Sequence, residues 1–400
     1  MTNEDFWGNG YVPRVAARSF GGVELALTPD LFGGMPSRPR WAVVDAPTAE
    51  TNEHLVSFLR DSGVGVLIDT QAWRYADQRT WESTRWADTP YAPNGPFTMA
   101  PDWVTDYVAG DLEAQKRLGA TAVILPNWFS ALRHDAAQVF VWALDGYRKF
   151  RRSALHKAVV WMPMRLNTLD QSLDIASLAA ESGEIEAIIA QFERISPLQA
   201  SVGQLASTLS GLVAVQDEGL PVLAGRFGSI GVTARAFGVK AAECGPAEEQ
   251  TFDAASMIRS ALPRANAGAG GPGGPPAAPI WFSELGQTVL ANRATKLRQI
   301  RRANAEILCR RPCHQYRIGK ETLTTSARHG LLSRLEEADQ AQSLPPGLRL
   351  DAARRHLDRM GDAIDVVNRA VEDDGCQWQL KRDHVTTQQA VLTFSAHGAA

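Results

Sequence analysis

The chain has 400 residues, of which 44% are hydrophobic and 21% charged, so it can bury the core of one large domain or two smaller ones. This composition excludes a disordered chain, and four Cys in this length are no disulfide framework. No apolar run approaches the roughly 20 residues of a membrane span, and the N-terminus lacks a secretory pattern. We therefore expect a cytoplasmic protein without membrane contact.

Short apolar segments alternate with amphipathic helical segments after an irregular stretch at residues 1–22. The expected strands are Val23–Leu27, Trp41–Asp45, Val64–Asp69, Thr121–Pro126, Ala158–Pro163, Glu186–Phe192, Pro221–Ala224 and Val239–Glu243. The expected helices are 49–61, 102–118, 133–154, 170–182, 198–218 and 230–237. This alternation predicts an α/β fold, a (β/α)8 TIM-type barrel with a C-terminal helical extension. A doubly wound open sheet is the alternative, although no GxGxxG motif follows the first strand.

In a barrel, the residues that do chemistry lie at the carboxyl ends of the strands. The polar residues that follow or end the expected strands are Asp45, Asp69, Asn127, Arg165, Glu193, Arg226 and Glu243. Asp69 and Glu243 form a candidate catalytic pair, because two carboxylates at a glycosidic bond can act as nucleophile and as proton-transfer group. Alternatively, each caps a helix or pairs with Arg226 or Arg165.

The glycine-rich turn Gly225–Gly231, GRFGSIG, follows the seventh expected strand. Glycines let backbone N–H groups approach an anion, and barrels often bind phosphate in the loops after strands seven and eight. Candidate substrate-binding residues here are Gly225, Arg226, Gly228 and Ser229, together with Asp45, Trp73, Asn127 and Arg165. A tight strand-to-helix turn needs the same glycines.

The connection from Thr70 to Pro101 is too long for an ordinary turn. It carries aromatic residues interleaved with arginines: Trp73, Tyr75, Trp81, Trp86 and Tyr91 with Arg74, Arg79 and Arg85. Such residues stack on bases and hold phosphates. Alternatively, the rings form a small packed core over the end of the barrel.

A Gly-, Pro- and Ala-rich linker divides the chain into a barrel, 1–262, the linker, 263–280, and a helical C-terminal unit, 281–400. Helices are expected at 287–308, 327–342 and 350–373. The last has an apolar stripe that includes Leu357, Ile364 and Val371, which predicts docking on the barrel or on the preceding helix. A homodimer seam is the other interpretation.

The segment 293–320 has nine Lys or Arg and one acid, whereas the whole chain has a net charge of −3. Such a segment predicts contact with nucleic acid or is a solvated helix. The candidate nucleic-acid-binding residues are Arg298, Arg301, Arg302, Arg310 and Arg311. Cys309, Cys313, His314 and His329 are of the types that bind a structural zinc, and they form our candidate metal site.

Three segments resemble the tRNA-guanine (queuine or archaeosine) transglycosylase family. Val66–Tyr75, VLIDTQAWRY, is similar to the family's catalytic-aspartate segment, Asp-Ser-Gly-Gly-aromatic-Gln after a buried strand. Gly228–Pro246 resembles the later segment, in which a turn and a short helix lead into a strand ending Asp-Cys. The basic, Cys-containing segment 293–320 has a place comparable to the family's zinc subdomain.

The resemblance implies base exchange, in which a nucleophile displaces guanine from its ribose and a 7-deazaguanine then displaces the enzyme. Asp69 would match the proton-handling aspartate, Trp73 the aromatic that stacks on the base, and Glu243 the nucleophile. The chain departs from the family pattern because the nucleophile is Glu instead of Asp and Gln71-Ala72 replace the paired glycines. One cysteine of the zinc cluster is also absent.

Three functions therefore follow from the sequence. The first is base exchange on RNA or DNA with a small-molecule base as the second substrate. The second is a barrel enzyme for a small phosphorylated metabolite, and the third is a non-catalytic nucleic-acid-binding barrel.

Overall fold

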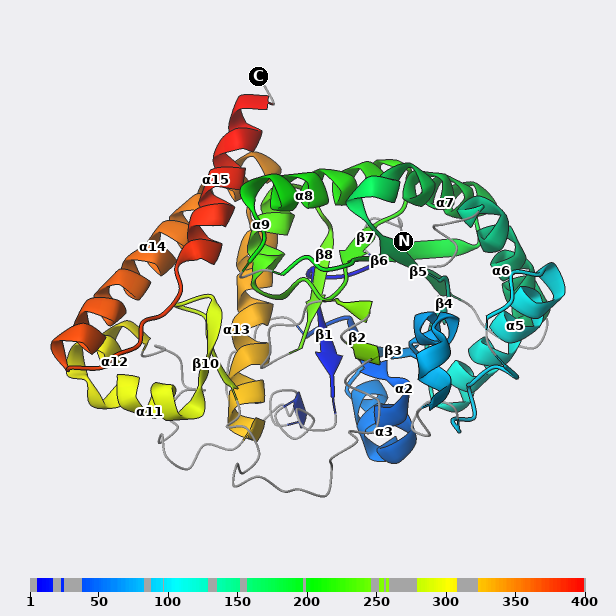
Figure 1. Cartoon of the computed structure of the whole chain (residues 1–400), viewed down its shortest axis with the longest axis horizontal. Coiled ribbons are helices and arrows are strands. Elements are labelled where there is room, and N and C mark those ends of the chain that lie inside the picture. Colours follow the sequence, from blue (N-terminus) through cyan, green and yellow to red (C-terminus); the bar gives the residue numbers. More distant parts are fainter. Residues whose placement is uncertain are drawn as a thin grey trace.

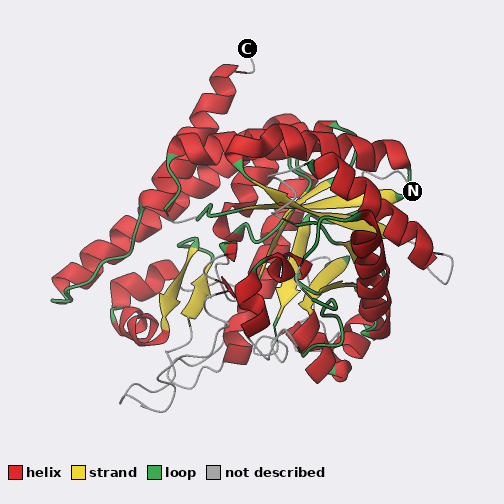
Figure 2. Cartoon of the chain, turned by 45° about the vertical axis from the view of Figure 1, so that its right-hand side comes forward, coloured by secondary structure: helices red, strands yellow, loops and turns green. Residues whose placement is uncertain are grey.

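The computed structural model of the protein describes residues 6–16, 23–24, 38–82, 88–95, 97–128, 135–151, 157–196, 199–245, 252–254, 257–258, 279–307 and 323–398. Within these ranges, parallel strands form a barrel that helices surround (Figure 1, Figure 2). The predicted (β/α)8 barrel with a helical C-terminal region is confirmed.

The barrel has eight strands: β1 (Tyr11–Val15), β2 (Trp41–Asp45), β3 (Gly65–Asp69), β4 (Val123–Leu125), β5 (Ala158–Met164), β6 (Ile185–Phe192), β7 (Val222–Ala224) and β8 (Ala241–Cys244). Their order is β3-β2-β1-β8-β7-β6-β5-β4, and all neighbours are parallel. The outer strands meet through a parallel bridge between Leu67 and Ala122, next to a 2.9 Å bond from Thr121 N–H to Val66 O. The sheet therefore closes, and most strand residues are buried on both faces, as their apolar runs predict.

Seven helices lie between or beside the strands: α2 (Ala46–Thr51), α3 (Glu53–Asp61), α5 (Pro101–Arg117), α6 (Ala136–Arg151), α7 (Leu169–Ser182), α8 (Val202–Asp217) and α9 (Gly231–Ala236). Short 3-10 helices are η3 (Ala72–Ala76), η4 (Gln78–Glu82), η6 (Leu166–Thr168) and η7 (Gly228–Ile230). A capping box begins α8, in which Ser201 Oγ accepts a 3.2 Å bond from Gln204 N–H. None of the described helices combines the length and the apolarity needed to cross a lipid bilayer.

The first strand is Tyr11–Val15, within the stretch expected to be irregular, so the predicted strand Val23–Leu27 was wrong. Residues 23–24 are helical, and 25–27 lie outside the described ranges. The sequence YVPRV hides the strand because Pro13 cannot donate to a ladder and a charged Arg14 is unusual in a buried strand. Nevertheless, β1 lies between β8 and β2, with Pro13 opposite Cys244 and Arg14 opposite Val43.

The C-terminal unit begins with an antiparallel hairpin of β9 (Pro279–Phe282) and β10 (Gln287–Leu290). Its helices are α11 (Ala291–Gln299), α12 (Arg301–Ile307), α13 (Leu323–Ser343), α14 (Pro346–Asp373) and α15 (Asp383–Gly398). The predicted helix 287–308 is thus a strand and two helices, which separate at the extended backbone of Ile300. The apolar stripe of α14 packs in a core with α11, α12 and α15, and Val232 and Ala236 of α9 pack against the same core. Helix α14 therefore docks both within the C-terminal unit and on α9 of the barrel.

Helix α13 belongs to the barrel as well as to the C-terminal unit. Its residues Leu331, Leu332, Leu335 and Ala338 share the hydrophobic core of the barrel strands. The helix contacts β1, β9, α9 and α14, and Figure 1 shows it between the barrel and α14. It therefore covers the side of the barrel formed by β8 and β1.

This packing predicts that a cavity in α13 destabilises the barrel. Leu335 is fully buried, so Leu335→Ala is expected to lower the free energy of unfolding by about 2–5 kcal/mol in urea denaturation. The control is Leu348→Ala in α14, where the side chain is 51% exposed and the expected change is below about 0.5 kcal/mol. Equal effects of the two substitutions would contradict the assignment of α13 to the barrel core.

Candidate active site at the barrel mouth

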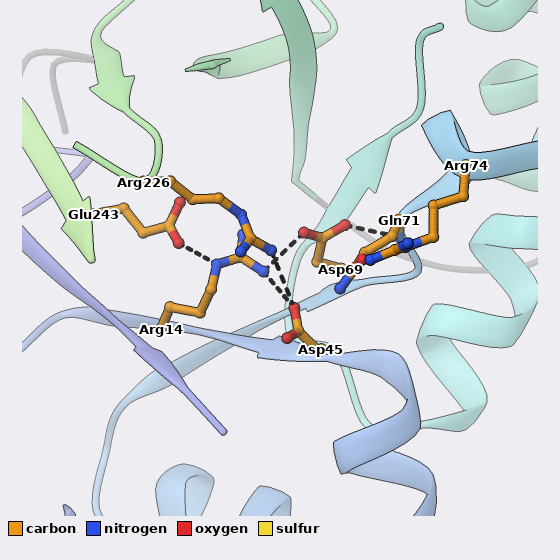
Figure 3. A network of polar contacts seen from close by, with 7 residues as sticks. All are labelled: Arg14, Asp45, Asp69, Gln71, Arg74, Arg226 and Glu243. Atoms are coloured by element: carbon orange, nitrogen blue, oxygen red, sulfur yellow. Dashed lines mark hydrogen bonds and ion pairs between the residues drawn. The ribbon is translucent and has the colours of Figure 1, made fainter. Parts of the chain in front are cut away.

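One arginine connects three carboxylates at the barrel mouth, the edge formed by the carboxyl ends of the strands. Arg14 Nη1 contacts Asp45 and lies 2.8 Å from Asp69 Oδ2, and Arg14 Nε contacts Glu243 (Figure 3). Burial alone would lower the pKa of Arg14, which is 2% exposed, but the three carboxylates raise that pKa well above its usual value. The guanidinium is therefore the fixed positive centre of the site.

Strand register explains why these side chains meet. Asp45 and Asp69 are partners across β2 and β3, and Glu243 is opposite Val12 on β8 and β1. Because β8, β1, β2 and β3 are consecutive neighbours, their carboxyl ends form one continuous part of the mouth. Asp69 and Glu243 do share this mouth, but they pair with Arg14 rather than with Arg226 or Arg165. The sequence analysis missed Arg14 because it missed β1.

Both oxygens of Asp69 are occupied by protein donors. Oδ2 accepts from Arg14, and Oδ1 accepts a 2.8 Å bond from the backbone N–H of Gln71. Gln71 has a φ of 55°, in the left-handed region, and its Oε1 accepts a 2.6 Å bond from Arg74 Nε. Asp69 is thus held rigidly, with its carboxylate bound on both sides.

Arg226, after β7, is a second cation beside Arg14. Its Nη2 lies 3.7 Å from Asp45 Oδ1, too far for a hydrogen bond, and its φ of 55° is left-handed. Burial and the charge of Arg14 lower the pKa of Arg226. Burial opposes the ionisation of Asp45, but Arg14 and Arg226 outweigh it and lower the pKa of that carboxyl. Figure 3 shows both guanidinium groups between Glu243 on one side and Asp45 and Asp69 on the other.

Several buried polar atoms at the mouth have no hydrogen-bond partner among the described residues. They are Glu243 Oε2, Arg226 Nε and Nη2, both side-chain polar atoms of Gln191, and Asn127 Nδ2. Glu243 and Gln191 are fully buried, Asn127 is 1% exposed and Arg226 is 7% exposed. Leaving such atoms without a partner costs about 1–3 kcal/mol each, so a ligand or water is expected to meet them.

Other predicted residues lie away from this cluster or have structural partners. Arg165 Nε donates to Glu193 Oε2 at 2.7 Å where β5 and β6 end. In the glycine-rich turn, Gly225 N–H donates to Ala190 O at 2.8 Å, and Gly228 O accepts a 3.1 Å bond from Arg334 of α13. The side chain of Ser229 lies outside the described part of the chain.

The described aromatic side chains of the long loop are packed in the barrel core. Trp73 is 4% exposed, with its ring edge-on to Phe252 at 5.0 Å and Arg74 Cζ 4.6 Å above it. Tyr75 and Tyr91 are buried in the same core. These three rings belong to the main core of the barrel instead of a small core of their own, and stacking of Trp73 on a base stays a prediction.

Asp111 of α5 is a buried carboxyl that sequence reasoning overlooked. It is 2% exposed, accepts a 2.8 Å bond from Gln115 Nε2 and lies 3.5 Å from the Tyr107 hydroxyl. Burial raises its pKa to about 7, against the lowering effect of hydrogen bonds from Thr70 and Gln115, while the charge of Asp69 raises it further. In the sequence, Asp111 is one polar position on an amphipathic helix, so nothing indicates its burial.

The candidate metal and nucleic-acid residues are described only in part. Cys309, Cys313, His314, Arg310 and Arg311 lie outside the described ranges. His329 is buried in α13, with Nδ1 3.3 Å from Ser333 Oγ. Arg301 and Arg302 are exposed on α12, and Arg298 is half-buried on α11. The described residues contain no His, Cys, Asp and Glu group suited to a metal ion, and zinc and nucleic-acid binding stay predictions.

Removing the charge of Arg14 leaves three carboxylates close together. We expect Arg14→Met to lower the free energy of unfolding by about 3–5 kcal/mol at neutral pH, because the buried carboxylates of Asp69 and Glu243 lose their ion-pair partner. Arg301→Met on exposed α12 is the control, and equal stability of the two variants in urea denaturation would exclude a central role for Arg14.

Asp111 makes a pH-dependent contribution to stability. Its pKa is about 7 in the folded protein against an ordinary value of 3.8, so the folded state holds the proton more tightly. The free energy of unfolding should therefore fall between about pH 4 and pH 7, by an amount on the order of a few kcal/mol. We expect Asp111→Asn to remove this component in urea denaturation across that pH range. An unchanged pH profile in the variant would contradict the burial of Asp111 as a protonated group.

No family model and no curated protein matches the chain. Among solved structures, it is similar to the N-terminal endo-1,4-beta-D-xylanase 10B of Clostridium thermocellum, with 11% identity and a TM-score of 0.38, over 64% of this chain and 66% of that one. It is also similar to a carboxyl transferase domain of Rhizobium etli pyruvate carboxylase, with 11% identity and a TM-score of 0.35, over 99% of this chain and 60% of that one. Neither is a tRNA-guanine transglycosylase, and likenesses this weak say nothing about function.

Proposed function

We propose that the barrel mouth binds a nucleobase and that the protein exchanges this base at an N-glycosidic bond of a nucleic acid, with Glu243 as the nucleophile. The observation that carries the proposal is that the mouth contains both a buried carboxylate oxygen, Glu243 Oε2, and a buried amide, Gln191, that lack hydrogen-bond partners in the described part of the chain.

Strand register supports this proposal because Gln191 and Glu243 belong to one row of residues, on strands separated only by β7. Ala190, Ala224 and Ala242 are in register across β6, β7 and β8, so the next row contains Gln191, Gly225 and Glu243. Residues of one row on parallel strands point to the same side of the sheet. A Cβ on Gly225 would collide with the side chain of Gln191. The glycine therefore gives Gln191 its space, and β7, the strand between Gln191 and Glu243, carries no side chain in this row.

The chemistry of this row suits the edge of a base. The amide of Gln191 offers one acceptor and two donor hydrogens, and the Glu243 carboxylate oxygen is an acceptor. Asn127 Nδ2 adds a further donor. A base edge that presents N–H groups and a carbonyl can bond to the side-chain amides, as enzymes that bind single bases do through such edges, while Glu243 Oε2 faces the sugar.

Arg14 fits Glu243 for nucleophilic attack, because it binds one carboxylate oxygen and leaves Oε2 for the substrate. Oε2 would donate an electron pair to the sugar carbon as the carbon–nitrogen bond breaks. The departing base keeps the bonding pair and takes a proton from water; the incoming base then loses a proton to water and displaces Glu243. We assign Asp69 to orienting Arg14, because both of its oxygens already accept hydrogen bonds. This differs from the proton-handling role that the family resemblance implies.

The nucleic acid would contact the C-terminal unit. Arg301 and Arg302 are exposed on α12, and Arg298 lies on the adjoining α11. Arg334 of the same unit donates to Gly228 O in the turn that carries Arg226, so this unit directly adjoins the mouth. Basic side chains of this kind bind phosphates without reading sequence.

A small phosphorylated metabolite is the second candidate substrate. The observation that favours it is Arg226, a buried guanidinium two residues after β7 with two nitrogens that lack hydrogen-bond partners in the described part of the chain. Barrels frequently bind phosphate at this position, and a guanidinium can hold a phosphate through two parallel hydrogen bonds. In this case, anion binding would depend on Arg226 and not on Gln191.

The deciding experiment is incorporation of isotope-labelled guanine into mixed tRNA and into duplex DNA by the purified protein. We expect label in one polymer and a loss on the order of a thousandfold or more in Glu243→Gln, because the amide cannot act as the nucleophile. The matched control is Glu193→Gln, a carboxylate at the end of β6 that pairs with Arg165 outside the cluster, which should retain activity.

Each other outcome identifies one alternative. Undiminished incorporation by Glu243→Gln would exclude Glu243 as the nucleophile. If no labelled guanine enters either polymer but the protein binds nucleic acid with an affinity that falls as salt rises, a non-catalytic nucleic-acid-binding barrel is favoured instead. If neither label nor retention is seen, phosphate binding that is lost in Arg226→Met would favour the metabolite enzyme.

A further inference from the structure

A cavity lies outside the charged cluster of the mouth, between α5 and the segment 90–94. It has a volume of about 370 Å³, which is within the range of small-molecule sites. One face of α5 supplies Asp102, Trp103, Asp106, Tyr107 and Asp111 to its lining. None of the residues that form Arg14's cluster contributes to it.

Aromatic rings form a fixed wall of this cavity. Trp103 and Tyr107, one helical turn apart, stack with ring centroids 5.3 Å apart and an interplanar angle of 17°. Trp128 packs against both rings, and Phe97 packs edge-on against Trp103. Tyr91 lines the cavity from the opposite segment. Aromatic faces held in this way attract a cation through their negative π-clouds.

The charged groups that line the cavity in the described part of the chain are all acidic. Asp102 is exposed at the rim, and Asp106 is exposed and pairs with Lys149 at 2.6 Å. Asp111 is 2% exposed. A bound cation would favour the ionised form of Asp111, whose pKa burial raises to about 7. The cavity is therefore an electronegative environment next to a rigid aromatic wall.

An organic cation suits this arrangement better than a metal ion. The acids lie four and five residues apart along α5, about 6–8 Å at 1.5 Å per residue, so they do not converge on one point. Accordingly, no group of three or more metal-ligand side chains is found among the described residues. Aromatic rings and dispersed carboxylates are the features that bind an ammonium with apolar substituents.

We propose that the cavity between α5 and the segment 90–94 is a binding site for an alkylammonium compound, with Trp103 and Tyr107 against its apolar groups and Asp111 and Asp102 as counter-charges. The site is separate from the proposed base-exchange site, and its ligand is a second compound.

The test compares choline with its uncharged carbon isostere dimethylbutanol by isothermal titration calorimetry on the full chain. The two probes have nearly the same shape, so their difference in affinity measures the contribution of charge. We expect choline to bind at least about tenfold more tightly than dimethylbutanol. Asp111→Asn and Trp103→Leu should each weaken choline binding by about tenfold, whereas Asp170→Asn, an exposed carboxylate on α7, should leave it unchanged.

Two results would overturn the proposal. One is equal affinity for the two probes, or no saturable binding of either. The other is choline affinity that is the same in Asp111→Asn and in Trp103→Leu as in the unmodified protein. Titration of Glu243→Gln separates this site from the mouth, because that variant should retain choline affinity even where base exchange is lost.

Discussion

The ion pairs of Arg14 determine how the mouth of this barrel is arranged. Its guanidinium binds carboxylates from β2, β3 and β8, so a single side chain on β1 connects four neighbouring strands. Taking charges out of water is costly, and such a cluster is stable only when each charge has a well-placed partner. Asp69 meets this requirement fully, because backbone and side-chain donors bind both oxygens. Glu243 meets it through one oxygen only.

One residue of the mouth combines missing hydrogen bonds with conformational strain. Arg226 has a left-handed backbone and two guanidinium nitrogens without hydrogen-bond partners in the described part of the chain, and Gly225 leaves space that the amide of Gln191 occupies. A left-handed backbone at a residue other than glycine costs roughly 1–2 kcal/mol. Folding stability alone does not favour these features. They are the features expected of a surface that a ligand completes, and for this reason the proposed function rests on them.

The sequence predicted the features that depend on local pattern. Strands β2 to β8 were recognised as short apolar runs, and the rule that polar residues at strand ends line the mouth found Asp45, Asp69, Arg226 and Glu243. Strand β1 was missed because Pro13 and Arg14 contradict the pattern of a buried strand. Arg14, the ion-pair partner of Asp69 and Glu243, was missed with it. Gln191 lies within an apolar run of the sequence. Its side chain has space in the barrel because residue 225, on a different strand, is a glycine. The burial of Asp111 arises where α5 packs on the barrel, with Thr70, Tyr107 and Gln115 beside the carboxyl group. These properties depend on contacts between distant residues, which one sequence does not specify.

The position of α13 on the barrel has a consequence for folding. Strand β1 is made first, but its neighbour β8 lies more than half the chain away, and α13, which covers both, comes still later. Arg14 likewise meets Glu243 across 229 residues of sequence. Contacts between such distant residues make folding slow, because loop closure must precede the gain in free energy from packing. During synthesis, therefore, β1 and the charge of Arg14 can reach their final packing only after α13 has been made.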